Sequence, residues 1–431
     1  MNPASIFPFS ELVRDGVVTP GFGPGDRCDP FWSIPWANQS GGAAIIWRSL
    51  ESERAVAAAG IRTPLRPGGR GHQPLTQEAA IALLNKRRSR RITLGAINLW
   101  RAITSQQLAA ITGQSGLASS RSDETALLFD AGLVQRGRVC YAGRALAEFP
   151  EVFRPNPQAG KIDLRQHLRY ADWMGVTLGT PPLQGHQYDR HNLLATELSL
   201  RAAELCPLRS VLGESAAGWP RLFDSKLRPN PHRSADAVWV RDDGLKIAIE
   251  VTATFTAATA TKIEQLAELL ARDTTKSILI LFVLAAHPGS DHELEAGRRL
   301  RQAIRKSSHA SRSRVLAKVS DRLLIMSWRS AFPGPGLVSR DFVPLRAQKY
   351  SSAGNSWVAV DLLDPYEIQF DGDPYVVEET SHNLNSVFGT PWHMRTGPGF
   401  DFDTYLLKAS GFDKVLEIDA RRRALVGRDV V

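Results

Sequence analysis

The stretch SADAVWVRDDGLKIAIEVTA, residues 234–253, predicts a β-hairpin at the centre of the fold. Two apolar runs flank a short polar turn, which is typical of two antiparallel strands. We expect these strands over Ser234–Arg241 and Leu245–Ala253, joined by Asp242-Asp243-Gly244. A three-residue loop that ends in glycine matches a type I turn closed by a residue in the left-handed region.

The length of this turn determines which residues of the two strands face each other. The loop pairs Arg241 with Leu245, and the register then places Asp236 directly opposite Glu250. Their Cβ atoms are expected about 5 Å apart on one face of the sheet. A shift of one residue in the loop would instead place the two carboxylates on opposite faces.

Two facing carboxylates repel each other, and a divalent cation between them removes that cost. Oxygen ligands at this spacing suit Mg²⁺ or Mn²⁺, which bind through one or two carboxylates, water and substrate phosphate. Asp236 and Glu250 are therefore candidate metal ligands. The alternative is a pair of solvated acids on an exposed face of the sheet.

The elements around the hairpin predict an α/β domain with a mixed sheet. An apolar run without charges, Ser277–Ala285, is typical of a strand buried on both faces. The order is α-β-β-β-α-β, with one crossover helix. Its members are the helix Asp189–Leu205, the strand Arg209–Glu214, the two hairpin strands, the helix Thr261–Ala271 and the strand Ser277–Ala285.

This segment resembles the core of the PD-(D/E)xK nuclease superfamily. More narrowly, it is similar to replication–relaxation proteins of bacterial plasmids and integrative elements, which join a winged helix to such a core. The similarity rests on His191, on Asp236-Ala237-Val238 and on Glu250, with Glu197 in the stretch HNLLATELSL. The resemblance implies that Asp236 and Glu250 bind Mg²⁺ or Mn²⁺ and that Glu197 is a third acid.

The same resemblance implies a lysine two residues after Glu250, where this sequence has Thr252. A threonine lacks the charge that activates the attacking water and stabilises the pentacovalent phosphate. Lys262, at the start of the next helix, is the candidate replacement, with Gln265 one turn later. Two alternatives stay open: Lys262 is an ordinary surface residue, or the site is degenerate and the domain only binds DNA.

A second patterned region, Ile92–Tyr141, predicts three helices followed by two short strands. The helices are expected over Ile92–Ala102, Ser105–Ile111 and Ser119–Ala131, and the strands around Arg136-Gly137-Arg138. This order is that of a winged helix-turn-helix. The words ITSQQLAAITG and ALLFDAGLVQRGRV resemble such DNA-binding domains in general.

The resemblance implies that the third helix enters the major groove and that the hairpin contacts the DNA backbone. Ser119, Ser120 and Arg121 would then lie near the duplex, with Arg136 and Arg138 on phosphates. The alternative is a winged helix used as a protein–protein module.

We therefore expect a multidomain protein that combines α+β and α/β folds. A helix over Glu293–Lys306 would place Arg298, Arg301 and Arg305 along one face that can follow a phosphate backbone. The expected regions are an irregular N-terminal arm (1–75), the winged helix-turn-helix (76–150), a connector (151–187), the nuclease-like domain with a basic extension (188–350) and an acidic C-terminal region (351–431) of unassigned role that is a possible site for a protein partner.

Composition favours an anionic partner and argues against a disulfide-rich, zinc-binding, membrane-spanning or secreted protein. The formal net charge is +9 and the sequence pI is about 9.6, as in many nucleic-acid-binding proteins, although a basic protein without such a partner stays an alternative. Three widely spaced cysteines indicate neither a disulfide framework nor a zinc site. The run Ile278–Ala286 is too short to span a membrane, and no secretory signal is visible, so we expect a cytoplasmic protein.

Three functions are compatible with these features. The first is a DNA-binding accessory protein of a mobile element, acting in replication, relaxation or transfer, whose nuclease-like fold lacks catalysis. The second is a Mg²⁺-dependent DNA endonuclease that uses Asp236, Glu250, Lys262 and Glu197. The third is a transcriptional regulator. The threonine at position 252 favours the first over the second.

Overall fold

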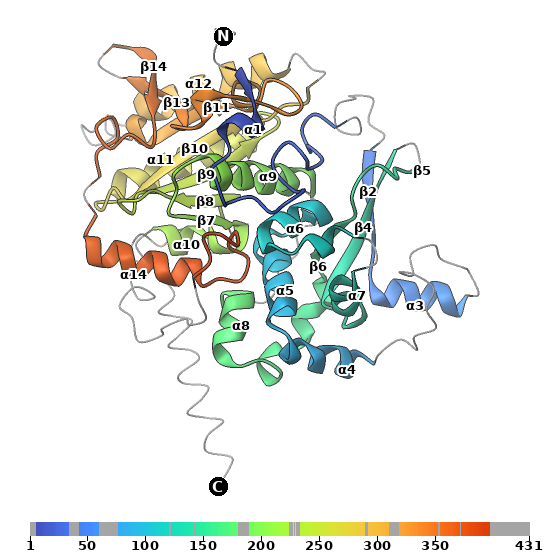
Figure 1. The fold of residues 1–431 in the computed structure, drawn as a ribbon. Helices are drawn as coiled ribbons and strands as arrows, with labels where there is room; N and C mark the ends of the chain where they lie inside the picture. The colour runs from blue at the N-terminus through green and yellow to red at the C-terminus, as the bar shows by residue number, and fades with distance from the viewer. Residues whose placement is uncertain are drawn as a thin grey trace.

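The computed structural model of the chain places two large sheets and the helices around them, so this is a mixed α/β protein. Figure 1 shows the larger sheet at the left, the smaller one at the right and helix α9 (Asp189–Leu205) between them. The structure describes residues 6–33, 43–59, 76–119, 122–141, 144–179, 189–223, 227, 229, 233–288, 292–309, 319–351, 354–370 and 372–396.

The larger sheet has seven strands in the order β14-β13-β11-β10-β9-β8-β7. Strands β9, β10 and β11 are parallel, and the strands on both sides of them pair antiparallel. Helices α11 (Ala257–Arg272) and α12 (His292–His309) connect the parallel strands, whose carboxyl ends therefore share one edge. The strands are β7 (Ser210–Gly213), β8 (Ala237–Val240), β9 (Lys246–Thr252), β10 (Ile278–Leu284), β11 (Leu323–Ser327), β13 (Arg346–Ser351) and β14 (Ser356–Asp361).

The central hairpin forms with the register expected from its turn. Ala237 pairs with Ile249, and the Arg241 N–H donates a 2.9 Å hydrogen bond to the Leu245 carbonyl. Gly244, the last residue of the turn, has a φ of +88°, which is the left-handed conformation that such a loop requires. The predicted register is confirmed, and the one-residue shift is excluded.

The predicted order of elements is also observed, as α9, β7, β8, β9, α11 and β10. Helix α11 starts four residues earlier than expected because Thr256 caps it: its Oγ1 accepts the Thr259 N–H at 3.3 Å. Three further strands, β11, β13 and β14, extend the sheet beyond the predicted core.

The smaller sheet belongs to the N-terminal half and has the order β2-β4-β6-β3, with β5 paired to β4. Helices α6 and α7 of this half both contact α5, around a shared apolar core. The bounds are β2 (Ala43–Arg48), β3 (Ile103–Thr104), β4 (Val134–Tyr141), β5 (Arg144–Ala145), β6 (Val152–Pro155), α5 (Arg88–Trp100), α6 (Ser105–Thr112) and α7 (Asp123–Asp130).

The predicted hairpin turn at Arg136-Gly137-Arg138 is wrong. These residues lie inside the continuous strand β4, and the strands that return along it are β5 and β6. Gly137 serves close packing and not a turn, since a Cβ at this position would lie 2.6 Å from Ile45 Cγ2 and 2.9 Å from Trp47 Cε3 on β2. The third helix is also shorter than Ser119–Ala131 and begins at Asp123.

The first 75 residues are not an irregular arm where the structure describes them. Strand β1 (Ile6–Pro8) pairs with β12 (Leu337–Ser339), and β2 pairs with β4 along its full length. Two helices follow these strands, α1 (Phe9–Leu12) and α3 (Leu50–Ala58). The segment therefore joins both halves of the molecule, because its apolar strands complete sheets formed by later residues.

Arg27, from this N-terminal segment, is buried among the charges of helix α9. Its guanidinium lies 2.9 Å from Glu197 Oε1 and 2.6 Å from Glu204 Oε1. Arg201 Nε contacts Glu197 Oε1 at 3.1 Å, and Gln107 Nε2 of α6 donates to Glu197 Oε2 at 3.2 Å. The network connects the N-terminal segment, α6 and α9.

The C-terminal region packs back onto the helices of the N-terminal half. Phe388 fits against Gly95, where a Cβ would lie 2.6 Å from the Phe388 Cβ. The indole N–H of Trp100 donates to the Gly389 carbonyl at 2.9 Å, and the Trp392 N–H donates to Ile111 at 2.8 Å. A single hydrophobic cluster includes residues of every predicted region, so these regions pack against one another.

Short elements complete the fold. None of the helices in the described part of the chain is long and apolar enough to cross a membrane. The remaining elements are α4 (Gln77–Ala82), α8 (Tyr170–Thr177), α10 (Trp219–Leu222), α13 (Trp328–Ala331), α14 (Pro374–Asn385) and the 3₁₀ turns η2 (Leu83–Lys86), η3 (Ser115–Ala118), η4 (Pro157–Lys161), η5 (Leu164–Gln166), η6 (Glu214–Ala216), η9 (Ser320–Arg322) and η10 (Arg340–Phe342).

Replacing Arg27 with alanine is expected to lower the free energy of unfolding by about 3–5 kcal/mol, because Glu204 would stay buried without its ion-pair partner and Glu197 would keep only Arg201. Urea denaturation measures this loss. The matched control is Arg48→Ala, since Arg48 forms a partly exposed ion pair with Glu53 whose removal costs about 0–1 kcal/mol. Equal losses for the two variants would contradict the conclusion that Arg27 makes the N-terminal segment part of the fold.

Candidate functional site

Four ionisable side chains gather at the edge of the larger sheet where β9 ends. Glu250 lies near the carboxyl end of β9, and Asp236 directly precedes β8. Lys262 comes from the second turn of α11, which begins shortly after β9. His191 comes from the first turn of α9. Four separate elements therefore supply the cluster.

Lys262 contacts Glu250 directly. Its Nζ forms an ion pair with Glu250 Oε2, and the Glu250 side chain is only 5% exposed. The other carboxylate oxygen, Oε1, is buried and has no hydrogen-bond partner among the residues placed by the structure. The pKa of Glu250 is raised to about 7, chiefly by burial; the Lys262 charge opposes the rise and the Asp236 charge adds to it.

Lys262 remains a cation in this environment. Burial lowers the pKa of Lys262, but the charges of Glu250 and Asp236 outweigh burial and raise the pKa above its ordinary value. The ammonium group therefore persists at neutral pH, beside two carboxylates and with 29% of its side chain exposed.

Asp236 is held by the backbone of β9 and by His191. Its N–H donates to the Ile249 carbonyl at 2.9 Å, and its Oδ2 accepts the Val251 N–H at 2.7 Å. His191 Nδ1 lies 3.4 Å from Asp236 Oδ1, and His191 Nε2 contacts the Val251 carbonyl. Because a carbonyl only accepts, Nε2 carries the proton of that contact. These contacts fix the direction of the Asp236 carboxylate.

Glu214 belongs to the same cluster and was missed by the sequence analysis. Ser234 Oγ lies 3.3 Å from Glu214 Oε1 in a hydrogen bond. Burial raises the pKa of Glu214; the nearby Arg101 opposes this rise, and the Asp236 charge adds to it. No sequence signal identified it, since a glutamate at the end of a predicted strand is ordinary. Only the turn η6 beside Ser234 brings it to the cluster.

Asp236 and Glu250 fit a divalent-cation site formed by two carboxylates. Glu250 Oε1 is a buried acceptor without a donor, and a cation would satisfy it. Mg²⁺ and Mn²⁺ often use one or two carboxylates and complete their coordination with water and phosphate oxygens. No group of three or more His, Cys, Asp and Glu in the described ranges is arranged to hold a metal ion. The fit therefore rests on this pair.

Glu197 does not join the cluster, which corrects the expected third acid. It lies six residues after His191 on α9, about 120° away around the helix axis. Its carboxylate is fully buried against Arg27 and Arg201. Burial raises the pKa of Glu197, but these two cations outweigh burial and lower it. Glu197 is a structural ion-pair residue.

Among the predicted DNA contacts of the N-terminal half, the two arginines of β4 differ. Arg136 is buried and forms an ion pair with Glu151 at 2.6 Å. Arg138 is 43% exposed and lies 3.5 Å from Glu151. Ser119 is exposed. Ser120 and Arg121 lie outside the described residues. Among the predicted contacts that the structure describes in this half, Arg138 and Ser119 are thus accessible.

The predicted arginine stripe lies on α12 as expected. Ala296, Leu300 and Ile304 face the core, while Arg298 and Arg305 are exposed. Arg298 contacts Glu295 on the same helix. Arg301 donates to Gln348 at 2.8 Å, and its guanidinium lies 5.9 Å from the centre of the Trp357 ring. The stripe is basic, with Arg301 anchored on the neighbouring strands.

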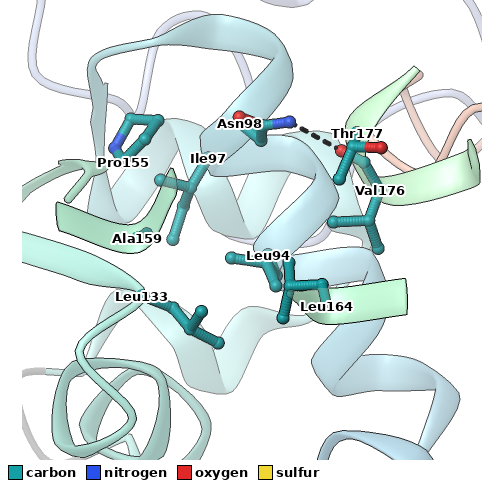
Figure 2. Close-up of a pocket in the computed structure, with 9 residues that line it drawn as sticks. All are labelled: Leu94, Ile97, Asn98, Leu133, Pro155, Ala159, Leu164, Val176 and Thr177. Atoms are coloured by element: carbon teal, nitrogen blue, oxygen red, sulfur yellow. Dashed lines mark hydrogen bonds between the residues drawn. The ribbon is translucent and has the colours of Figure 1, made fainter. Parts of the chain in front are cut away.

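A small cavity in the N-terminal half offers no alternative site. Figure 2 shows it between α5, η5 and α8, surrounded mainly by aliphatic side chains. Its volume is about 10 Å³, near the lower limit for a single water molecule. Asn98, the main polar side chain there, donates to the Val176 carbonyl at 2.9 Å. The cavity is a packing defect and too small for a substrate.

A scan against protein-family models, a search of curated proteins and a search of solved structures each found no match.

The raised pKa of Glu250 predicts a pH-dependent contribution to stability. The Glu250 carboxyl has a pKa of about 7 in the folded protein, against the ordinary value of 4.5 in the unfolded chain, so folding makes it bind a proton more tightly. The stability that this proton contributes is present below pH 4.5 and is lost as the pH rises through 7. Relative to Glu250→Gln, the wild type should lose about 2–3 kcal/mol between pH 4.5 and pH 8. Urea denaturation of both proteins across this range measures the difference, and a constant difference would contradict the raised pKa.

Proposed function

We propose that this protein binds DNA and hydrolyses phosphodiester bonds with a divalent cation held by Asp236 and Glu250. The observation that carries the proposal is the contact between Lys262 and Glu250. Thr252 stands where the resembling superfamily has its lysine, and a cation from α11 at the same carboxylate compensates for that departure.

Each residue has a role in this proposal. A bound Mg²⁺ or Mn²⁺ would polarise the phosphate and lower the pKa of an attacking water. Asp236 and Glu250 would hold the ion, and the Val251 N–H and His191 would orient Asp236. The partly exposed ammonium group of Lys262 would donate to a phosphate oxygen and stabilise the negative charge that builds up on it.

DNA binding is supported by the arrangement of the N-terminal half. The order α5, β3, α6, α7, β4, β6 agrees with a winged helix-turn-helix. Strand β6 lies between β3 and β4 and pairs antiparallel with both. The net charge of +9 favours a polyanionic partner. The first turn of α7 carries Asp123 and Glu124, so exposed arginines such as Arg138 are better candidates for phosphate contacts than this turn.

The second candidate is a DNA-binding accessory protein of a mobile element without catalysis. The observation that favours it is also the Lys262–Glu250 ion pair, because an internal cation balances a buried carboxylate without any metal. Metal-dependent cleavage distinguishes the two candidates.

Incubation with supercoiled and linear DNA in the presence of Mg²⁺ or Mn²⁺ is expected to give cleavage that EDTA abolishes. Asp236→Asn, Glu250→Gln and Lys262→Met should each lower the rate by about 100-fold or more, since each removes a group that acts on the developing charge. The matched control is Glu264→Gln, an exposed acid on the same helix as Lys262. DNA binding by the wild type without cleavage would favour the accessory role.

The two arginines of β4 should respond differently to replacement. Arg138→Ala is expected to weaken DNA binding. The slope of log affinity against log salt concentration should fall by about 0.9, as for one lost phosphate contact. Arg136→Ala should instead lower the free energy of unfolding by about 3 kcal/mol, because the buried Glu151 would keep only the more distant and partly exposed Arg138. Fluorescence anisotropy and urea denaturation measure the two effects, and an unchanged salt dependence for Arg138→Ala would exclude it as a phosphate contact.

A further inference from the structure

A second cation, Arg233, lies beside Lys262 at the candidate site. Arg233 precedes Asp236 by three residues, and its Nη1 donates a hydrogen bond to Gln265 Oε1 on α11. Gln265 follows Lys262 by three residues, so these two side chains lie on one face of the helix, one turn apart. Lys262 is half-buried against Glu250, whereas Gln265 and Arg233 are exposed. The three side chains thus lead from the buried carboxylate to the surface.

The backbone of Arg233 is held independently of its side chain. The Trp219 N–H donates to the Arg233 carbonyl at 3.1 Å, and the next residue, Ser234, forms an antiparallel bridge with Gly218. Ser234 Oγ lies 3.3 Å from Glu214 Oε1, within the cluster described above. Hydrogen bonds of both the main chain and the side chain therefore fix Arg233 beside Lys262.

The guanidinium group of Arg233 keeps its charge and most of its donors. Its partner Gln265 is neutral, and Arg233 forms no ion pair with a carboxylate in the ranges that the structure describes. The bond from Nη1 leaves the edge formed by Nε and Nη2, which carries two parallel N–H groups. Because this edge belongs to an exposed side chain, a ligand with two acceptor oxygens can bind to it.

We propose that Arg233, oriented by Gln265, binds the phosphodiester next to the one that is hydrolysed at Asp236 and Glu250, on the side of α11. The inference rests on the proposed function, because it names the residue that fixes the substrate strand at that site.

The position along α11 assigns different phosphates to the two cations. Gln265 lies about 4.5 Å further along the helix axis than Lys262, since each residue advances an α-helix by about 1.5 Å. Lys262 contacts Glu250 and is the cation at the reacting group. Arg233, one turn further on, reaches the neighbouring phosphate.

The chemistry of Arg233 suits this task. A guanidinium group binds two phosphate oxygens at once through parallel N–H groups, which an ammonium group cannot do. The carboxylates of Asp236, Glu250 and Glu214 repel a DNA strand, and an exposed cation beside them opposes this repulsion. Arg233 therefore contributes to binding of the strand and not to the chemical step.

The first test measures binding of a short fluorescein-labelled DNA duplex by anisotropy over a salt series, in EDTA so that no cleavage occurs. Arg233→Gln should weaken binding about three- to tenfold and reduce the slope of log affinity against log salt concentration by about 0.9. Arg233→Lys should keep the slope of the wild type because the charge stays, but should bind less tightly because the second parallel N–H is lost. Circular dichroism melting confirms that each variant is folded.

The second test measures steady-state cleavage with Mg²⁺. Arg233→Gln should raise KM and leave kcat within about twofold of the wild type, whereas Lys262→Met lowers kcat. A fall in kcat at unchanged KM would place Arg233 at the reacting phosphate and overturn the neighbouring position. The matched control is Arg272→Gln, an exposed arginine in the last turn of α11, whose replacement should leave affinity, slope and KM unchanged.

The outcomes separate this site from the proposed function. An unchanged slope for folded Arg233→Gln would overturn the phosphate contact, even if the wild type cleaves DNA. A reduced slope in a protein that binds DNA but never cleaves it would support the contact and refute hydrolysis. Absence of any DNA binding would overturn both.

Discussion

Helix α9 is the constraint on which the rest of the structure depends. It lies between the two sheets and is buried along nearly its whole length, although it carries Glu197, Arg201 and Glu204. Buried charges must be paired, so Arg27 from the N-terminal segment has to be inserted beside them. This requirement joins the first residues of the chain to its centre. It explains why the N-terminal segment is part of the fold and not an arm.

The same helix connects the N-terminal half with the candidate site. At its start, Asp189 accepts a hydrogen bond from the Trp47 indole and forms an ion pair with Arg154 of β6. Two residues further along the helix, His191 contacts Asp236. The first turn of α9 thus contacts both the smaller sheet and the carboxylate cluster. A displacement of α9 would move both contacts together.

Basic residues in this chain serve two purposes that composition cannot separate. Arg90 and Arg91, in the first turn of α5, form ion pairs with Glu124 and Asp172. Arg136 likewise forms an ion pair with Glu151. Arg138, Arg298 and Arg305 keep a large part of their charge at the surface. The net charge therefore overstates the number of arginines that are available to DNA.

The sequence alone was sufficient to predict the hairpin, because turn length and a left-handed glycine determine the register within a few residues. The order of α9, β7, β8, β9, α11 and β10 followed from the periodicity of apolar residues. Tertiary structure alone decided the partners of the charged residues. It placed Lys262 on Glu250, brought Glu214 into the cluster and removed Glu197 from it. It also turned Gly137 from an expected turn residue into a packing position. The physical reason is that burial and ion pairing depend on segments distant in sequence, which local periodicity does not encode.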